Sequence, residues 1–473
     1  MTRMGEKAMN LLVRLGPRFL PFADAASPDL PLGRLLRLSL FQVSVGMALV
    51  LLVGTLNRVM IVELGVSAAL VGIMVSLPLI FAPFRALIGF RSDTHSSALG
   101  WRRVPYMWRG TMVQFGGLAL MPFALLVLAG GGESADAPAW IGQAGAGLAF
   151  LLVGAGLHMT QTVGLALATD LAPVESHPKV VGLMYVMLLV GMVASALVFG
   201  ALLADFSPLR LVQVIQGSAL ATILLNVVAL WKQEPRRPDR NFAAQAASPA
   251  RPRFADAWNR FVQGERAVRR LVAIGLGTMA FGMSDVLLEP YGGQVLGMAV
   301  GTTTALTATL AVGGLFGFGL ASRVLARGAD PFRMASYGAL AGLPAFGALI
   351  ASAPLQAPML FAVGTFLVGF GAGLFGHGTL TATMNLAPKS QAGLALGAWG
   401  AVQASAAGVA VAIGGIVYEL VAASSFGARF GNATGFAVVY ALEIALLVAA
   451  LVAMLPLLRR RAAAFSPREP ALS

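Results

Sequence analysis

The stretch DLAPVESHPKVVGLMYV (residues 170–186) has a counterpart in the second half of the chain, NLAPKSQAGLALGAWG (residues 385–400). Both stretches carry Leu-Ala-Pro directly after their first residue, and Gly182 of the first keeps the same spacing as Gly397 of the second. Each lies between the fourth and the fifth apolar segment of its half of the chain. A match that keeps one offset indicates that the two halves are repeats in the same direction.

The composition predicts an all-α polytopic membrane protein. Of the 473 residues, 58% are hydrophobic and only 11% are charged, whereas soluble chains are roughly 25% charged. Each apolar segment is long enough to cross a hydrocarbon core of about 30 Å. We expect twelve transmembrane helices, at residues 35–62, 67–90, 104–129, 140–169, 179–204, 209–231, 271–296, 300–326, 333–352, 357–385, 391–420 and 433–458.

The longest polar interval divides these spans into two sets of six. The sequence therefore predicts an N-terminal six-helix bundle (residues 35–231), a cytoplasmic linker (232–268) and a C-terminal six-helix bundle (269–458). Residues 1–34 are expected to form a cytoplasmic segment with the spacing of an interfacial helix, and residues 459–473 a cytoplasmic tail. Two six-span halves repeated in parallel are the architecture of the major facilitator fold.

The positive charge follows the topology. The net charge is +13, and all but three of the basic residues fall on the side that holds both termini; the exceptions are Arg58, Arg210 and Arg429. The positive-inside rule places that side in the cytoplasm. This accounts for the charge without nucleic acid and leaves membrane lipid as its partner. The chain has no cysteine and no recognisable catalytic or metal-binding motif, so we expect neither an enzyme nor a metal site.

A second motif follows the second span. The segment GFRSDTHSSALGWRR (residues 89–103) resembles the loop between the second and third helices of major facilitator proteins. It supplies Gly89, which permits close helix approach, Asp93, which can cap a helix or form an ion pair, and the basic pair Arg102 and Arg103.

Polar side chains gather in the first, fourth, seventh and tenth spans, which line the central cavity of a major facilitator fold. Ionisable groups inside a membrane are costly and usually face the bundle interior. The candidates are Asn57, Arg58, Glu63, His158, Asp170, Asp285, Glu289, His377 and Asn385.

Span seven is the most unusual of these. Asp285 and Glu289 are four residues apart, which places them on one face of a helix, and Pro290 with the following Gly-Gly pair allows a break. Arg58 lies at a similar depth in span one. We hypothesise that Arg58 pairs with Asp285 or Glu289 and links the two halves; the alternative is separate snorkelling to the outer interface.

Two histidines and a threonine run leave alternatives open. His158 and His377 lie mid-span, where a neutral imidazole can bind the magnesium of a chlorin or simply be a satisfied core residue. The run TTTALTAT (residues 302–309) is expected to direct its hydroxyls back to its own helix.

Several long stretches look like the PucC/LhaA family, the bacteriochlorophyll delivery branch of the major facilitator superfamily. They are LPLGRLLRLSLFQVSVGMALVLLVGTLNRVMIVELGV (30–66), LGWRRVPYMW (99–108), LATDLAP (167–173) and DVLLEPYGG (285–293). The similarity runs from about Leu11 to Arg461 and supplies no catalytic residue.

The resemblance implies an assembly factor for light-harvesting antenna complexes (LH1 or LH2) in the intracytoplasmic photosynthetic membrane of a bacterium. Such a factor binds or delivers bacteriochlorophyll, with carotenoid a further candidate ligand. The implied partners are the light-harvesting α and β polypeptides, bacteriochlorophyll synthase, the translocon and the membrane insertase. The alternative is a secondary transporter of a small solute, proton-coupled through Asp170, Asp285 or Glu289. The apolar midplane of the cavity helices favours an apolar ligand over a polar solute, which needs a wet site there.

Overall fold

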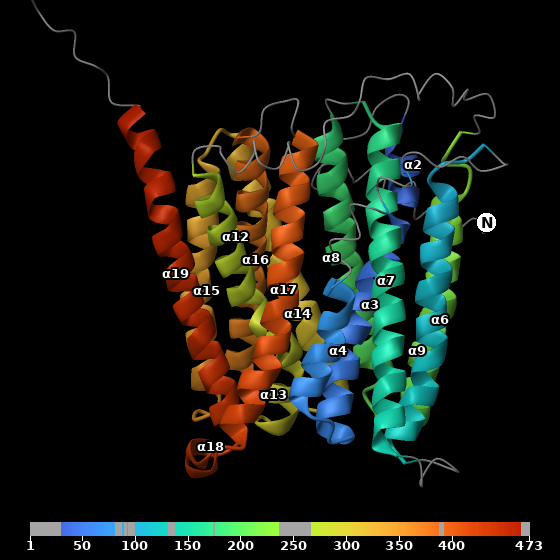
Figure 1. Ribbon diagram of the computed structural model, residues 1–473, viewed down its shortest axis with the longest axis vertical. Coiled ribbons are helices and arrows are strands. Elements are labelled where there is room, and N and C mark those ends of the chain that lie inside the picture. The colour runs from blue at the N-terminus through green and yellow to red at the C-terminus, as the bar shows by residue number, and fades with distance from the viewer. Residues whose placement is uncertain are drawn as a thin grey trace, which may run out of the picture. The chain divides into compact units, whose positions relative to one another are not determined.

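The computed structural model describes residues 30–80, 88, 92, 100–130, 138–173, 176–235, 266–386 and 392–464. Within these ranges the regular structure is entirely helical (Figure 1). They contain eleven helical stretches long and apolar enough to cross a membrane, and a shorter apolar helix, Ala68–Leu79, where span two was predicted. The predicted all-α membrane class is thus confirmed.

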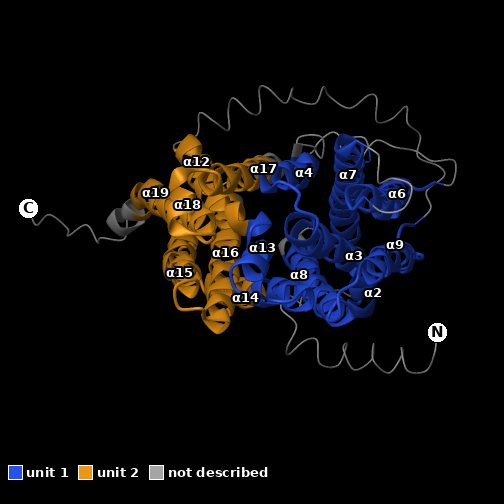
Figure 2. Cartoon of the chain, turned by 90° about the horizontal axis from the view of Figure 1, so that it is seen from below, with its two compact units in different colours: residues 1–248, 285–312 blue, residues 249–284, 313–473 orange. Residues whose placement is uncertain are grey.

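The chain divides into two compact units (Figure 2). Unit 1 comprises residues 1–248 and 285–312, and unit 2 comprises residues 249–284 and 313–473. The seventh span therefore begins in unit 2 and ends in unit 1. The boundaries of the two six-helix bundles stay a prediction.

In unit 1, α6 (Val104–Leu128) packs along α7 (Ala139–Leu171), and α3 (Leu40–Leu49) packs against α8 (His177–Leu202) and α9 (Pro208–Leu230). Their interior contains a hydrogen-bonded chain of fully buried polar side chains. Ser44 donates to the Asn226 side-chain oxygen at 2.9 Å, and the Asn226 amide donates to Thr111 at 2.9 Å. Such bonds hold membrane helices together where lipid offers no hydrophobic contrast.

Unit 2 contains α12 (Ala267–Gly282), α15 (Pro331–Ser352), α16 (Pro358–Leu386), α17 (Ala392–Ala422), the short α18 (Ser425–Phe430) and α19 (Thr434–Ala464). Helices α15 and α16 approach closely, since a Cβ on Gly338 would lie 2.5 Å from the carbonyl oxygen of Gly371. The Asp330 side chain caps the start of α15 by accepting from the backbone N–H groups of Phe332 and Arg333.

Two spans are irregular. Span one consists of α2 (Leu32–Leu38), α3, and two π-helical stretches, η2 (Val50–Leu56) and η3 (Val59–Glu63). Span seven is interrupted by a 3₁₀ turn, η6 (Met283–Val286), between α12 and α13 (Leu288–Gln294), and α14 (Val300–Ala326) follows. The break thus precedes Pro290, which corrects the predicted position. Pro290 lies in the first turn of α13. The N–H groups of a first turn have no acceptor within the helix, so the N–H that proline lacks costs the helix no hydrogen bond.

Candidate functional site

The break in span seven exposes backbone groups that need partners, because no water reaches the hydrocarbon region. In unit 2, the carboxylate of Glu443 on α19 accepts from the backbone N–H of Ser284 at 2.6 Å. In unit 1, the Asn57 amide donates to the backbone carbonyls of Asp285 and Val286 at 3.4 and 3.2 Å. Both side chains are fully buried, so the freed backbone groups are satisfied by polar groups from other spans.

Glu289 is the centre of a polar cluster in unit 1. It is 1% exposed and accepts from Thr307 at 2.5 Å and from Thr304 at 3.4 Å, both on α14. On the side of span one, Gly54 in η2 makes room for this carboxylate, because a Cβ there would clash with a Glu289 oxygen. The glycine and the carboxylate are thus matched in shape.

The threonine run of α14 therefore has two roles. Thr303 and Thr309 donate to backbone carbonyls of their own helix, as predicted. Thr304 and Thr307 instead bind Glu289, which corrects the expectation for these two positions.

Arg58 has a different partner from the one predicted. Its Nη1 donates to Glu63 Oε1 at 2.5 Å, and its Nη2 to the carbonyl of Met298 at 3.3 Å. Among the described residues it forms no direct ion pair with Asp285 or Glu289, although its charge still acts on the Glu289 carboxylate, so the hypothesis is corrected in naming the direct partner, which is Glu63. The reason is local: five residues span about 500° in an α-helix and would point 140° apart, whereas the i→i+5 closure of η3 brings residues 58 and 63 together.

Asn57, Arg58 and Glu289 nevertheless belong together. Asn57 and Arg58 of span one donate to backbone carbonyls of residues 285–312, and Glu289 of that segment lies against Gly54 of span one. We call these three residues, with Glu63, Thr304 and Thr307, the span-one cluster. Its one cation, Arg58, is paired with Glu63, and the cluster connects α13 and the start of α14 to the first span of unit 1. The Asp285 carboxylate makes no hydrogen bond or ion pair within the described ranges.

A second cluster lies where α6 begins and α7 ends. Asp170 accepts from Arg102 and, at 2.9 Å, from Arg103 Nε, while Arg103 Nη1 donates to Ser92 at 2.6 Å. Asp170 therefore lies at the end of α7, next to the basic pair of the loop motif. It was predicted to line the central cavity. Gly89 and Asp93 of the same motif lie outside the described residues.

The same helix end is capped from a distance. The carboxylate of Glu234, beyond the end of α9, accepts from the backbone N–H groups of Arg102, Arg103 and Val104 at 2.8 to 3.1 Å. These donors have no acceptor within α6, and the helix dipole also favours a negative charge there. Glu234 therefore anchors the chain after α9 to the start of α6.

The two histidines lie in different units. His158 on α7 is 9% exposed. His377 on α16 is half-buried, and its ring lies 4.2 Å, centroid to centroid, from that of Phe318. Asn385 is in the last turn of α16. His377 is thus the more accessible of the two imidazoles.

Sequence reasoning missed Glu443, Glu234, Thr304 and Thr307 as site residues. Glu443 had a visible signal, since it is a lone carboxylate in the apolar run ALEIALL. Glu234 had none, because it lies in a charged segment where an acid is ordinary.

Comparison with known proteins gives a consistent result. The family model described as PUCC protein matches residues 55–462. A protein named PucC from Rhodovulum sulfidophilum is 64% identical over 422 residues, which cover 89% of this chain and 92% of that protein. A PucC from Cereibacter sphaeroides is 61% identical, covering 89% and 90%. A protein named bacteriochlorophyll synthase 44.5 kDa chain, from Rhodobacter capsulatus, is 29% identical, covering 82% and 88%.

Among solved structures, a variant of the nucleoside transporter NupG has a TM-score of 0.67 at 14% identity and covers 90% of this chain and 100% of its own. At that identity the likeness concerns the fold alone, and it confirms the predicted major facilitator fold.

Proposed function

Because the chain belongs to the PucC family and is a multi-pass membrane protein, we propose that it is a non-enzymatic assembly factor for bacterial light-harvesting antenna complexes. It binds or delivers bacteriochlorophyll, the newly inserted α and β polypeptides, or both, in the intracytoplasmic membrane with both termini cytoplasmic. The observation that carries this proposal is the identity of 61–64% to PucC proteins over 89% of the chain.

Two further observations support a pigment as cargo. One relative bears the name of a bacteriochlorophyll synthase chain. In addition, most polar groups of the span-one cluster are bonded to one another or to the backbone, the exceptions being the buried Asn57 Oδ1 and Arg58 Nε, which leaves few of them for a hydrated solute. A pigment has a mainly apolar surface and needs few hydrogen bonds from such groups. His377 is the candidate ligand for its magnesium, with His158 as the second candidate.

The experiment is an affinity purification of the tagged full-length chain from photosynthetically grown membranes. We expect antenna polypeptides by mass spectrometry and bacteriochlorophyll by absorbance, with bacteriochlorophyll synthase, translocon and insertase subunits as further partners. A tagged major facilitator transporter expressed to the same level is the control. Absence of both pigment and antenna polypeptides from the sample would refute the assembly role.

Histidine ligation is tested separately. His377→Phe keeps the ring size and removes the nitrogen ligand, so bound bacteriochlorophyll should fall while antenna polypeptides still co-purify. His158→Phe is the matched comparison. Unchanged pigment in the variant that carries both substitutions would exclude histidine as the magnesium ligand without affecting the proposed assembly role.

A secondary transporter is the second candidate, favoured by the likeness to a transporter fold and by Glu289, a buried carboxylate between two spans. Proteoliposomes containing the purified chain distinguish the two. Uptake of a small solute that depends on a proton gradient and is lost in Glu289→Gln would favour transport.

A further inference from the structure

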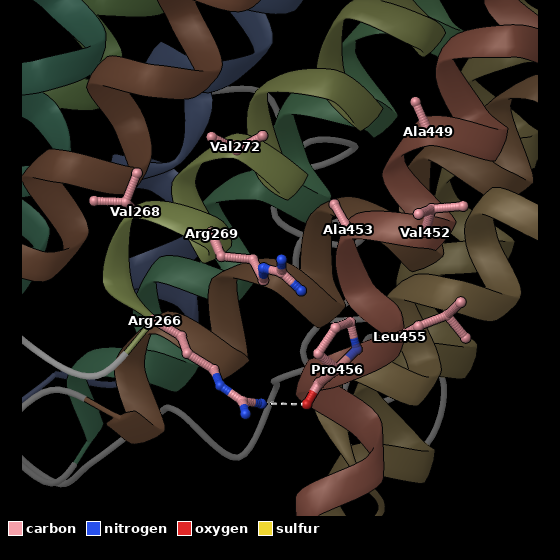
Figure 3. A pocket seen from close by; sticks show the side chains of 9 residues that line it. All are labelled: Arg266, Val268, Arg269, Val272, Ala449, Val452, Ala453, Leu455 and Pro456. Carbon is pink, nitrogen blue, oxygen red and sulfur yellow. Dashed lines mark hydrogen bonds between the residues drawn. The ribbon is translucent and has the colours of Figure 1, made fainter.

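A groove runs along unit 2 between the start of α12 and the end of α19 (Figure 3). Its volume is about 920 Å³, at the upper end of the roughly 300–1,000 Å³ range of small-ligand sites. Seven of its nine lining residues are apolar: Val268, Val272, Ala449, Val452, Ala453, Leu455 and Pro456. The groove has depth because α19 contributes small side chains one turn apart, Ala449 and Ala453.

The two remaining lining residues are arginines at one end of the groove. Figure 3 shows Arg266 and Arg269 extending from α12 toward α19. Arg266 donates to the backbone carbonyl of Pro456, and neither guanidinium forms an ion pair with any residue that the structure describes. The first turn of α12 carries no acidic residue. The groove therefore has a cationic end and an apolar length.

The backbone reinforces this end. Arg266 adopts a left-handed conformation, with φ of 60°, which for a residue other than glycine costs on the order of 1 kcal/mol. It precedes α12 directly, so the first N–H groups of that helix, which lack intrahelical acceptors, lie at the same end of α12 as Arg266 and Arg269. A strained arginine held at a helix start, next to an apolar groove, is arranged for a ligand with a negative head and an apolar tail.

The geometry points to a binding site for one anionic glycerophospholipid of the phosphatidylglycerol type. The phosphate diester lies between Arg266 and Arg269, and one acyl chain lies along Val272, Ala449 and Ala453. A phospholipid matches the groove, which is cationic at one end and apolar along its length. The charged headgroup of the lipid lies at the membrane interface, and its acyl chain runs parallel to the helices. The chlorin pigment is a poorer match, since it carries no anionic group for the two arginines. This site is independent of the proposed assembly function.

Native mass spectrometry of the purified full-length protein tests the site. The protein is delipidated and then titrated with phosphatidylglycerol or with phosphatidylcholine of the same acyl chains. We expect tighter binding of phosphatidylglycerol, and a loss of about fivefold for each of Arg266→Gln and Arg269→Gln, as for a basic residue at an anionic lipid surface. Arg333→Gln, an exposed charge on α15 outside the groove, is the matched control and should leave binding unchanged.

A steric variant tests the apolar part. Ala453→Leu fills the groove without changing charge, so it should weaken the binding of both lipids. Equal binding of the two lipids by the unmodified protein, or full retention of phosphatidylglycerol by the double arginine variant, would overturn the assignment. So would a loss of co-purifying bacteriochlorophyll in Ala453→Leu with lipid binding intact, because the groove would then hold pigment.

Discussion

Removing either partner of the Arg58–Glu63 ion pair should have unequal effects, because the two side chains are unequally buried. The Arg58 side chain is 5% exposed and that of Glu63 is 36% exposed. In Glu63→Gln, the guanidinium remains charged, since arginine does not deprotonate in proteins, and it is left in a buried place without its carboxylate. In Arg58→Met, the carboxylate that remains can be hydrated, and the methionine fills most of the vacated volume.

The magnitudes follow from this difference. Breaking a fully buried ion pair by removing one partner costs about 3–5 kcal/mol, and an exposed pair contributes about 0–1 kcal/mol. Since water can replace part of what Glu63 supplies, we expect Glu63→Gln to lower the free energy of unfolding by about 2–3 kcal/mol. Arg58→Met should cost about 1 kcal/mol, which is typical of a single substitution. The double variant should resemble Arg58→Met, which gives a coupling of about 2 kcal/mol.

The assay is reversible unfolding of the purified full-length chain in mixed micelles by titration with dodecyl sulfate, followed by tryptophan fluorescence. Size-exclusion profiles confirm that each variant is folded before titration. The reasoning is refuted if Glu63→Gln is no more destabilising than Arg58→Met, or if the two effects simply add in the double variant. Either result would mean that the ion pair does not hold η3 in its observed form.

The same assay tests three other contacts. Glu234→Ala should cost about 2 kcal/mol, since it leaves the N–H groups at the start of α6 without their acceptor, and Glu234→Gln should cost less because one oxygen remains. Gly54→Ala should cost about 1–3 kcal/mol by overpacking against Glu289; a neutral effect would show that the two do not touch. Thr307→Val removes a donor to Glu289 and should cost about 1–3 kcal/mol, whereas Thr309→Val, whose hydroxyl bonds its own helix, should be close to neutral.

The fold could be predicted from the sequence because its signals are local and repeated. Span length, the side of the basic residues and the repeat of Leu-Ala-Pro each depend on residues in one stretch of chain, and all indicate the same architecture. The positions of the helices were also close. Span eight, for instance, was predicted at residues 300–326, and α14 occupies Val300–Ala326.

Pairings within the candidate site were harder to predict, because they depend on backbone irregularities. The prediction for Arg58 assumed an α-helix, in which Glu63 would face away; the π-helical stretch η3 reverses that. The break of span seven was assigned to Pro290, the obvious helix breaker, yet the helix is interrupted at η6. No residue type in η6 indicates a helix break from the sequence. The break is stabilised by polar side chains from distant spans, which bind the freed backbone groups.

The irregular helices explain why several polar residues lie in the membrane interior. Asn57 and Glu443 serve backbone groups freed at the break in span seven, and Gly54 in η2 leaves room for Glu289. In a bilayer an unsatisfied backbone group costs several kcal/mol, so a broken span demands such side chains whatever the protein binds. Their presence alone therefore does not argue for a hydrated solute. Ligand recognition is better sought on apolar surfaces with a few placed polar groups, which is the kind of surface that a pigment or an antenna helix requires.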